Sequence, residues 1–233
     1  MSNPSMTPAV TQPVVEPITP QLTRFDPPSP PRAAILMLHG GKARSTDPVT
    51  GRSLSWRRSL VMQQTIARKA LDHGLSVWLL RYAVAGWNAE APGGPTPPPD
   101  ARNALAHLKS ELGAIPVVLL GHSMGARTAV AVADNPQVTG VVALAPWFPP
   151  DEPIRALAGK HLVAAHGRRD RITSYAHTQA YVERASQVAA SARMIDMGGR
   201  GHYLINGSYI WNDIALTHSC ALLDAALESV SDA

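Results

Sequence analysis

The stretch Pro116–Gly125 reads PVVLLGHSMG, an apolar run that leads directly into the pattern Gly-x-Ser-x-Gly. Residues 124–134 follow it with an Ala- and Val-rich sequence of helical character. A strand, a tight turn and a helix in this order predict a nucleophile elbow, in which a strained turn lifts the serine hydroxyl out of the sheet. Ser123 is therefore the candidate nucleophile.

Two partners are needed, because a serine hydroxyl is a poor nucleophile at neutral pH without a base and an acid that orients the base. On a sheet of this kind they follow in the order Ser, Asp or Glu, His, each after a later strand. Asp170 follows the apolar run 161–166, and His202 follows the run 192–196. We predict that His202 is the base and Asp170 the acid, in preference to Asp196 within a strand and Asp151 after an earlier one.

Negative charge on a tetrahedral intermediate requires backbone N–H donors near the nucleophile. The amide of Met124 is one candidate, since it follows the serine directly at the positive end of a helix. The second donor is expected in the loop after the apolar run 35–38, where the sequence is His-Gly-Gly-Lys. We choose Gly41 for it, with Lys42 as the alternative because the register of the turn is ambiguous by one residue.

These motifs, in this order, resemble the α/β-hydrolase superfamily over roughly residues 33 to 230, in particular its small single-domain bacterial esterases. The resemblance implies a three-layer α/β/α sandwich with a mostly parallel sheet of about six strands and little or no cap. It implies no cofactor. Dienelactone-hydrolase-like relatives carry cysteine at the elbow, where this chain has Ser123. Many relatives have proline where this chain has Thr173.

Apolar runs and helical stretches alternate along the chain, which favours a parallel sheet with helices on both faces. We predict strands at 35–38, 76–80, 117–120, 141–145, 162–166 and 192–196, and helices near 57–73, 100–112, 124–134, 173–190 and 213–229. Residues 1–31 contain nine prolines and little apolar periodicity, so we set them apart as a flexible N-terminal segment. Residues 32–233 are expected to form one hydrolase domain.

Composition narrows the class of protein. The only cysteine is Cys220, so we expect no disulfide framework and a reducing cytoplasm. The start of the chain does not resemble a signal peptide, and no apolar run approaches the ~18 residues of a membrane span.

A formal net charge of +4 without a basic helix argues against a nucleic-acid partner. Four histidines follow predicted strands, but no paired spacing links them, so we expect no metal site. The oligomeric state is left open.

The sequence says less about the substrate than about the fold and the catalytic residues. Residues 145–160 are few and proline-rich, so they leave no room for a cap, and an open site for a small ester follows. Trp87, Trp147 and Phe148 lie just beyond strand ends and are predicted to line the acyl pocket, with the loop 83–99 as a partial cover.

We therefore expect a serine hydrolase that cleaves carboxylic esters through an acyl-enzyme intermediate. A thioesterase acting on coenzyme A or carrier-bound acyl groups is the alternative, because basic residues that would attract an anionic substrate fall in loops expected at the rim of the site: Lys42, Arg44, Arg168, Arg169, Arg171 and Arg200. A non-catalytic receptor or interaction protein on the same fold is the less favoured reading.

Overall fold

A seven-stranded, mostly parallel sheet forms the centre of the computed structural model, which describes residues 20–88 and 95–231. Its strands lie in the order β1-β3-β2-β4-β5-β6-β7, and only the β1–β3 pair is antiparallel. The strands are β1 (Gln21–Phe25), β2 (Ala33–Leu38), β3 (Leu75–Arg81), β4 (Val117–His122), β5 (Val138–Leu144), β6 (His161–His166) and β7 (Ser191–Asp196).

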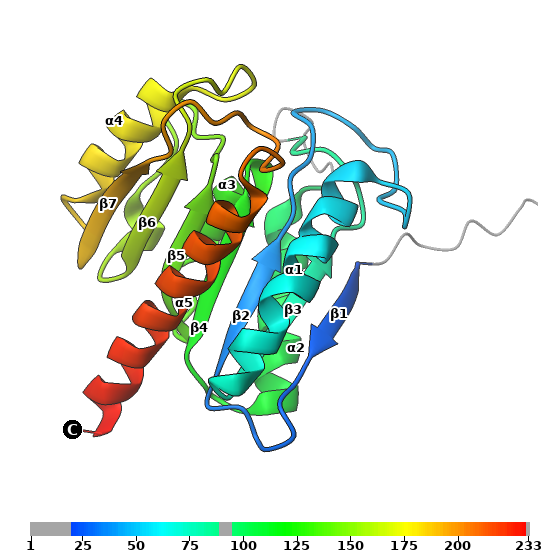
Figure 1. Cartoon of the computed structure of the whole chain (residues 1–233), viewed down its shortest axis with the longest axis vertical. Coiled ribbons are helices and arrows are strands. Elements are labelled where there is room, and N and C mark those ends of the chain that lie inside the picture. Colours follow the sequence, from blue (N-terminus) through cyan, green and yellow to red (C-terminus); the bar gives the residue numbers. More distant parts are fainter. Residues whose placement is uncertain (1–19, 89–94, 232–233) are drawn as a thin grey trace, which may run out of the picture.

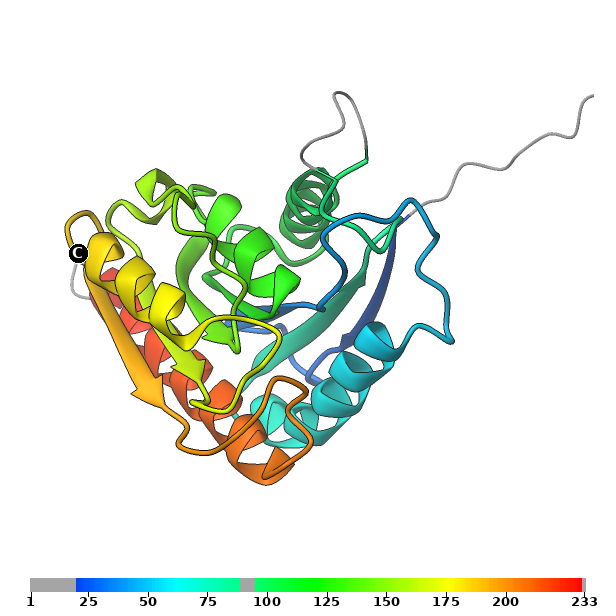
Figure 2. The same cartoon turned by 90° about the horizontal axis from the view of Figure 1, so that it is seen from above.

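Five α-helices cover the two faces of the sheet. They are α1 (Leu54–Asp72), α2 (Pro97–Leu112), α3 (Met124–Ala131), α4 (Tyr175–Ala185) and α5 (Ser208–Ser231). Figures 1 and 2 show α1 and α5 on one face and α2, α3 and α4 on the other. The predicted three-layer α/β/α architecture is thus confirmed.

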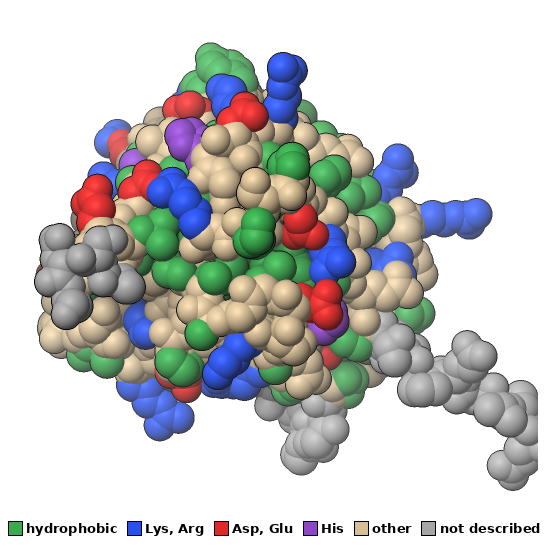
Figure 3. Space-filling view, turned by 90° about the horizontal axis from the view of Figure 1, so that it is seen from below, with side chains coloured by type: hydrophobic (Ala, Val, Ile, Leu, Met, Phe, Trp, Pro, Cys, Tyr) green, Lys and Arg blue, Asp and Glu red, His purple; other side chains and the backbone are tan. Residues whose placement is uncertain are grey.

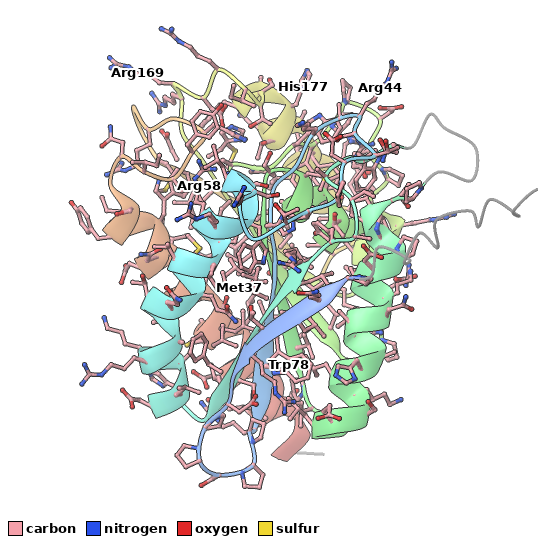
Figure 4. All side chains as sticks on the ribbon, turned by 90° about the vertical axis from the view of Figure 1, so that its right-hand side faces the viewer. Met37, Arg44, Arg58, Trp78, Arg169 and His177 are labelled. Atoms are coloured by element: carbon pink, nitrogen blue, oxygen red, sulfur yellow. The ribbon has the colours of Figure 1, made fainter. Side chains whose placement is uncertain are left out.

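Each face of the sheet has its own hydrophobic core. Met37 packs in the core beneath α1 and α5, whereas Trp78 packs in the core beneath α2 and α3 (Figure 4). Strands β2 and β4 are buried along their whole length. This explains their unbroken apolar sequences, because a parallel strand between two helical layers has no solvent-facing side.

Strand β1 lies within the segment 1–31 that the sequence analysis set apart. It pairs with β3 from Gln21↔Arg81 to Phe25↔Val77, and its Thr23 carbonyl accepts a hydrogen bond from the Gln63 side chain. A strand at the edge of a sheet needs a partner on one side only, so prolines just outside it are tolerated. The proline content of the segment therefore concealed a short strand. Residues 1–19 lie outside the described part of the chain.

The carboxyl ends of the parallel strands meet at one edge of the sheet, which is the upper edge in Figure 1 and faces the viewer in Figure 2. Between β5 and β6, residues 145–160 contain a single short 3-10 helix, η1 (Arg155–Leu157), in place of a cap. Figure 3 shows the opposite edge, where Lys and Arg side chains project singly around a surface of mixed polarity. None of the helices in the described segments is long and apolar enough to cross a bilayer.

Candidate active site

Ser123 occupies a strained turn between β4 and α3. Its backbone has φ 55 and ψ −116, a region that costs a non-glycine residue free energy and recurs at functional sites. The turn is held by neighbouring backbone. The Ser123 amide donates to Leu144 O (3.1 Å), and the Trp147 amide donates to Ser123 O (3.2 Å). A side chain on Gly125 would meet Leu38 O at 2.0 Å, so the glycine is needed for this close approach.

A continuous hydrogen-bond chain joins Asp170, His202 and Ser123. His202 Nδ1 lies 2.8 Å from Asp170 Oδ2, and His202 Nε2 lies 3.0 Å from Ser123 Oγ. With a neutral imidazole, Nδ1–H donates to the carboxylate and Nε2 accepts from the serine hydroxyl. All three side chains are almost fully buried. The arrangement has the geometry of a nucleophile, a base and an orienting acid.

Several groups besides His202 hold the carboxylate of Asp170. Its Oδ1 accepts hydrogen bonds from the amides of Ile172 and Thr173, both at 2.8 Å. Its Oδ2 lies 3.1 Å from His166 Nε2 and 3.0 Å from Thr173 Oγ1. Burial opposes ionisation of this carboxyl, but the hydrogen bonds from His166, His202 and the two amides together hold the pKa of Asp170 well below its usual range. Asp170 is therefore anionic, as an acid that supports a histidinium must be.

The sequence analysis missed the part that Thr173 plays in this cluster. It noted only that Thr173 replaces the proline of many relatives. In the structure the Thr173 hydroxyl lies beside this pair, 3.0 Å from Asp170 Oδ2 and 3.1 Å from His202 Nδ1. The available signal was the close spacing of His166, at the end of β6, with Asp170 and Thr173 in the loop that follows, since buried donors and acceptors this close in sequence tend to satisfy one another.

Two backbone amides beside Ser123 remain free among the described residues. The Met124 amide begins α3 and has no acceptor, and the Gly41 amide has none either. The Lys42 amide, by contrast, donates to Ala85 O at 2.8 Å, so it is already engaged. A side chain on Gly41 would meet Met124 Cε at 2.4 Å, so the Gly41 backbone lies against the Met124 side chain. Of the two alternatives left open by the sequence, Gly41 is the residue whose amide has no acceptor among the described residues.

A family model described as "Alpha/beta hydrolase family" matches residues 35–199. The chain belongs to the alpha/beta hydrolase family. The match covers well over half of the chain and includes the elbow, the Asp170 loop and the Gly40-Gly41 turn. A search of curated proteins found no significant match.

Solved structures of similar fold come from several bacteria. Est1E from Butyrivibrio proteoclasticus, solved with ferulic acid, is 12% identical with a TM-score of 0.62, over 91% of this chain and 96% of that chain. A Thermus thermophilus protein is 20% identical with a TM-score of 0.62, over 89% and 93%. An α/β serine hydrolase without lid from Xanthomonas campestris is 16% identical with a TM-score of 0.57, over 88% and 95%. At these identities the likeness establishes the fold alone.

Two buried histidines of this α/β hydrolase support the loops around Ser123. His39 Nδ1 donates to Gly40 O (2.6 Å) and its Nε2 accepts from the Tyr82 amide (3.3 Å). His122 Nε2 donates to His202 O at 2.9 Å. Burial lowers the pKa of His39 to about 4 and that of His122 to about 3, so both are neutral near pH 7. Among the described residues, no group of His, Cys, Asp and Glu is arranged to hold a metal ion.

The aromatic residues predicted to line the acyl pocket fall into two groups. Phe148 is buried and stacks on Tyr181 with 4.1 Å between ring centroids. Trp87 and Trp147 instead enclose the guanidinium of Arg127, whose Cζ lies 4.2 Å and 4.6 Å from their ring centroids. The backbone amide of Trp147 also donates a hydrogen bond to Ser123 O in the elbow. The two tryptophans therefore lie beside the elbow helix. The predicted loop cover, 83–99, includes residues 89–94, which lie outside the described residues.

The basic residues predicted at the rim of the site of this hydrolase are partly neutralised. Lys42 Nζ lies 3.5 Å from Asp47 Oδ2, and Arg168 is paired with Asp196. Arg200 donates to Met197 O at 2.7 Å. Figure 4 shows Arg44 and Arg169 extending outward from the upper edge of the sheet. The residues are at the predicted edge, but Lys42 and Arg168 are paired with carboxylates and Arg200 is bound to a backbone carbonyl.

Proposed function

We propose that this α/β hydrolase is a cofactor-independent serine hydrolase that cleaves small carboxylic esters through an acyl-enzyme intermediate. The observation that carries the proposal is the unbroken chain from Asp170 through His202 to Ser123, at 2.8 and 3.0 Å, on a strained elbow. The expected compartment is the cytoplasm, because the chain contains a single cysteine.

In the proposed mechanism, Ser123 Oγ attacks the ester carbonyl while His202 Nε2 takes the hydroxyl proton. The free amides of Met124 and Gly41 stabilise the oxyanion of the tetrahedral intermediate. His202 then returns the proton to the departing alcohol, which leaves an acyl group on Ser123. Water, activated by the same histidine, releases the carboxylic acid and regenerates the serine. Asp170 keeps the ring in the correct tautomer and stabilises its charged form.

Within the described residues there is no cap between β5 and β6, since only η1 occupies that interval. This supports a substrate that is a small ester or one end of a larger molecule. A thioester is the second candidate. It is supported by Arg169 and Arg171, which are exposed beside Asp170 and make no salt bridge in the described part of the chain. Exposed cations of this kind attract an anionic coenzyme A group over a distance of about 8 Å at physiological ionic strength.

The proposal is tested by the turnover of p-nitrophenyl esters of increasing chain length. Ser123→Ala should lower kcat by at least ~10³-fold without unfolding the protein. The matched control is Ser219→Ala, which removes a buried hydroxyl in α5 that has no hydrogen-bond partner among the described residues. Near-normal turnover by Ser123→Ala, or equal losses in the two variants, would remove Ser123 from the mechanism.

The same preparations distinguish the ester from the thioester candidate. For a thioesterase, kcat/KM for acyl-coenzyme A should fall steeply with added salt, while a neutral ester of equal chain length is little affected. Arg169→Glu should reproduce that selective loss. Equal salt dependence for the two substrates would leave carboxylesterase as the better description. No turnover and no covalent labelling of Ser123 would favour the non-catalytic receptor instead.

A further inference from the structure

A groove runs along the outer surface between α1 and α5, on the face of the molecule turned towards the viewer in Figure 1. Its volume is about 1040 Å³. One wall is the outward face of α1 from Leu54 to Lys69, and the other is the first two turns of α5. Leu204 and Ile205, just after His202, close the upper end. Neither Ser123 nor His202 lines the groove, but its upper end adjoins the candidate active site, because Tyr203 lies against both Arg58 and His202.

The groove gathers the most exposed large hydrophobic side chains in the described part of the chain. Tyr209 is 75% exposed, Leu54 74%, Ile205 70% and Val61 61%. All four line the groove. Soluble proteins seldom expose a contiguous apolar surface without a ligand or partner for it. The lining therefore predicts an occupant with an extended hydrocarbon part.

Cations line the same groove. Arg57, Arg58 and Lys69 contribute three positive charges from α1, against the single carboxylate of Asp213 from α5. None of these three cations is in a salt bridge with any described residue. The lining is thus apolar with a positive excess, which complements an anion.

Arg58 is the best-placed of the three cations. It lies on the upper turns of α1 (Figure 4) and is half-buried, with its Cζ 4.9 Å from the ring centroid of Tyr203. The N–H groups of this guanidinium have no hydrogen-bond acceptor among the described residues. A planar guanidinium in this state is suited to bind a carboxylate through two parallel hydrogen bonds.

We propose that the groove between α1 and α5 binds a single long-chain carboxylate, with the carboxylate on Arg58 and the alkyl chain along Val61 and Ile205. From Arg58 to Lys69 the helix extends about 17 Å at 1.5 Å per residue, close to the length of an extended chain of roughly 14 carbons. A second copy of this chain fits less well. A two-fold interface places the same patch against itself, and the cations of α1 would then face like charges.

The test is a fluorescence titration of the full-length Ser123→Ala variant with cis-parinaric acid, followed by displacement with palmitate. The Ser123→Ala background keeps the result independent of the proposed ester hydrolysis. We expect saturable binding of one ligand per chain by a monomer. Fatty acids from C8 to C16 should displace the probe at progressively lower concentration, by severalfold for each pair of methylenes, because each buried CH₂ adds favourable transfer free energy.

Two variants with one matched control locate the site. Val61→Asp should weaken binding at least about tenfold by placing a charge in the apolar lining. The control is Ile172→Asp. Ile172 is 59% exposed, which is similar to the 61% exposure of Val61, but it lies outside the groove. Arg58→Gln should weaken palmitate about tenfold and leave hexadecanol unchanged, since only palmitate carries the charge that Arg58 binds.

Each alternative occupant has a distinct outcome, measured by light scattering after gel filtration and by sedimentation with phosphatidylglycerol vesicles. A dimer that Val61→Asp dissociates would make the groove an interface between two copies and overturn the proposal. Binding to vesicles without saturable binding of monomeric palmitate would overturn it in favour of a lipid surface. Equal palmitate affinity in Val61→Asp and Ile172→Asp would also overturn it.

Discussion

The two halves of the upper sheet edge are built in different ways. At the ends of β4, β6 and β7, short loops place Ser123, Asp170 and His202, and direct hydrogen bonds between side chains join them. At the ends of β2 and β3, longer loops are joined backbone to backbone. Lys42 N donates to Ala85 O, and Trp87 N donates to Lys42 O. The first half fixes side chains, and the second half fixes a free backbone amide.

This difference determines what each half tolerates. A series of hydrogen bonds between side chains is broken when one functional group is exchanged, even if the backbone does not move. A backbone-positioned amide is unaffected by most side-chain changes, but it fails when the loop is displaced. Substitutions that preserve shape should therefore damage the first half, and substitutions that add volume should damage the second.

The largest effect is expected at Asp170. Asp170→Asn keeps the shape of the side chain but cannot stabilise the charged His202, so kcat should fall by about 10³- to 10⁴-fold. KM should change much less. The control is Asp196→Asn, because Asp196 is paired with Arg168 outside the hydrogen-bond chain. If Asp196→Asn, or Asp151→Asn, is the more damaging change, Asp170 is not the acid.

A smaller effect is expected at Gly41 in the second half. In Gly41→Ala the new Cβ would meet Ala85 O at 2.5 Å and Met124 Cε at 2.4 Å, so the loop must shift and the Gly41 amide with it. We predict a fall in kcat of about 10²-fold in a protein that remains folded. Gly51→Ala is the control, since a Cβ there meets nothing within 4 Å. Normal kcat in Gly41→Ala would exclude this amide as a donor.

The smallest effect is a dependence of stability on pH that involves both halves. His39 and His122 have pKa values lowered to about 4 and about 3. Their unfolded forms bind protons below pH ~6.5, and the native forms do not, so the stability that they contribute is complete above that pH. It is lost as pH falls towards 4 and 3, by about 1.4 kcal/mol per pH unit for each histidine.

Urea unfolding at pH 7, 6 and 5 measures this dependence. His122→Asn should make the free energy of unfolding depend less steeply on pH, because the contribution of one of the two histidines is removed. Asp170 contributes little in this interval, because the pKa of its carboxyl is held below the ordinary value near 3.8, and the stability that it adds is lost only at more acidic pH. An unchanged slope in His122→Asn would show that this ring is not neutral in the native state.

The sequence predicted the positions in the first half because topology sets them. Parallel strands with right-handed crossovers bring the residues after β4, β6 and β7 to one edge, so the order of the motifs was enough to place Ser123, Asp170 and His202 together. The partners of Asp170 were less accessible. Thr173 contributes through a rotamer and a loop conformation that no periodicity records.

Positions set by side-chain packing were not predictable in the same way. The sequence predicted that Trp87 and Trp147 line the acyl pocket but gave no sign that Arg127 lies between their rings. It also gave no sign of the pairing of β1 with β3, because a single edge strand of five residues has too short a pattern to stand out among prolines. The groove between α1 and α5 depends on how two helices distant in sequence lie together.

The most direct test of the account is covalent labelling with a fluorophosphonate probe, followed by intact-mass and peptide analysis. The account predicts one adduct per chain on Ser123, and slower labelling by at least ~10²-fold in His202→Gln, because only the His202-activated hydroxyl attacks phosphorus readily. It predicts no adduct in Ser123→Ala. An unlabelled native protein, or an adduct at the same rate on another serine in Ser123→Ala, would contradict the assignment of Ser123 as the nucleophile.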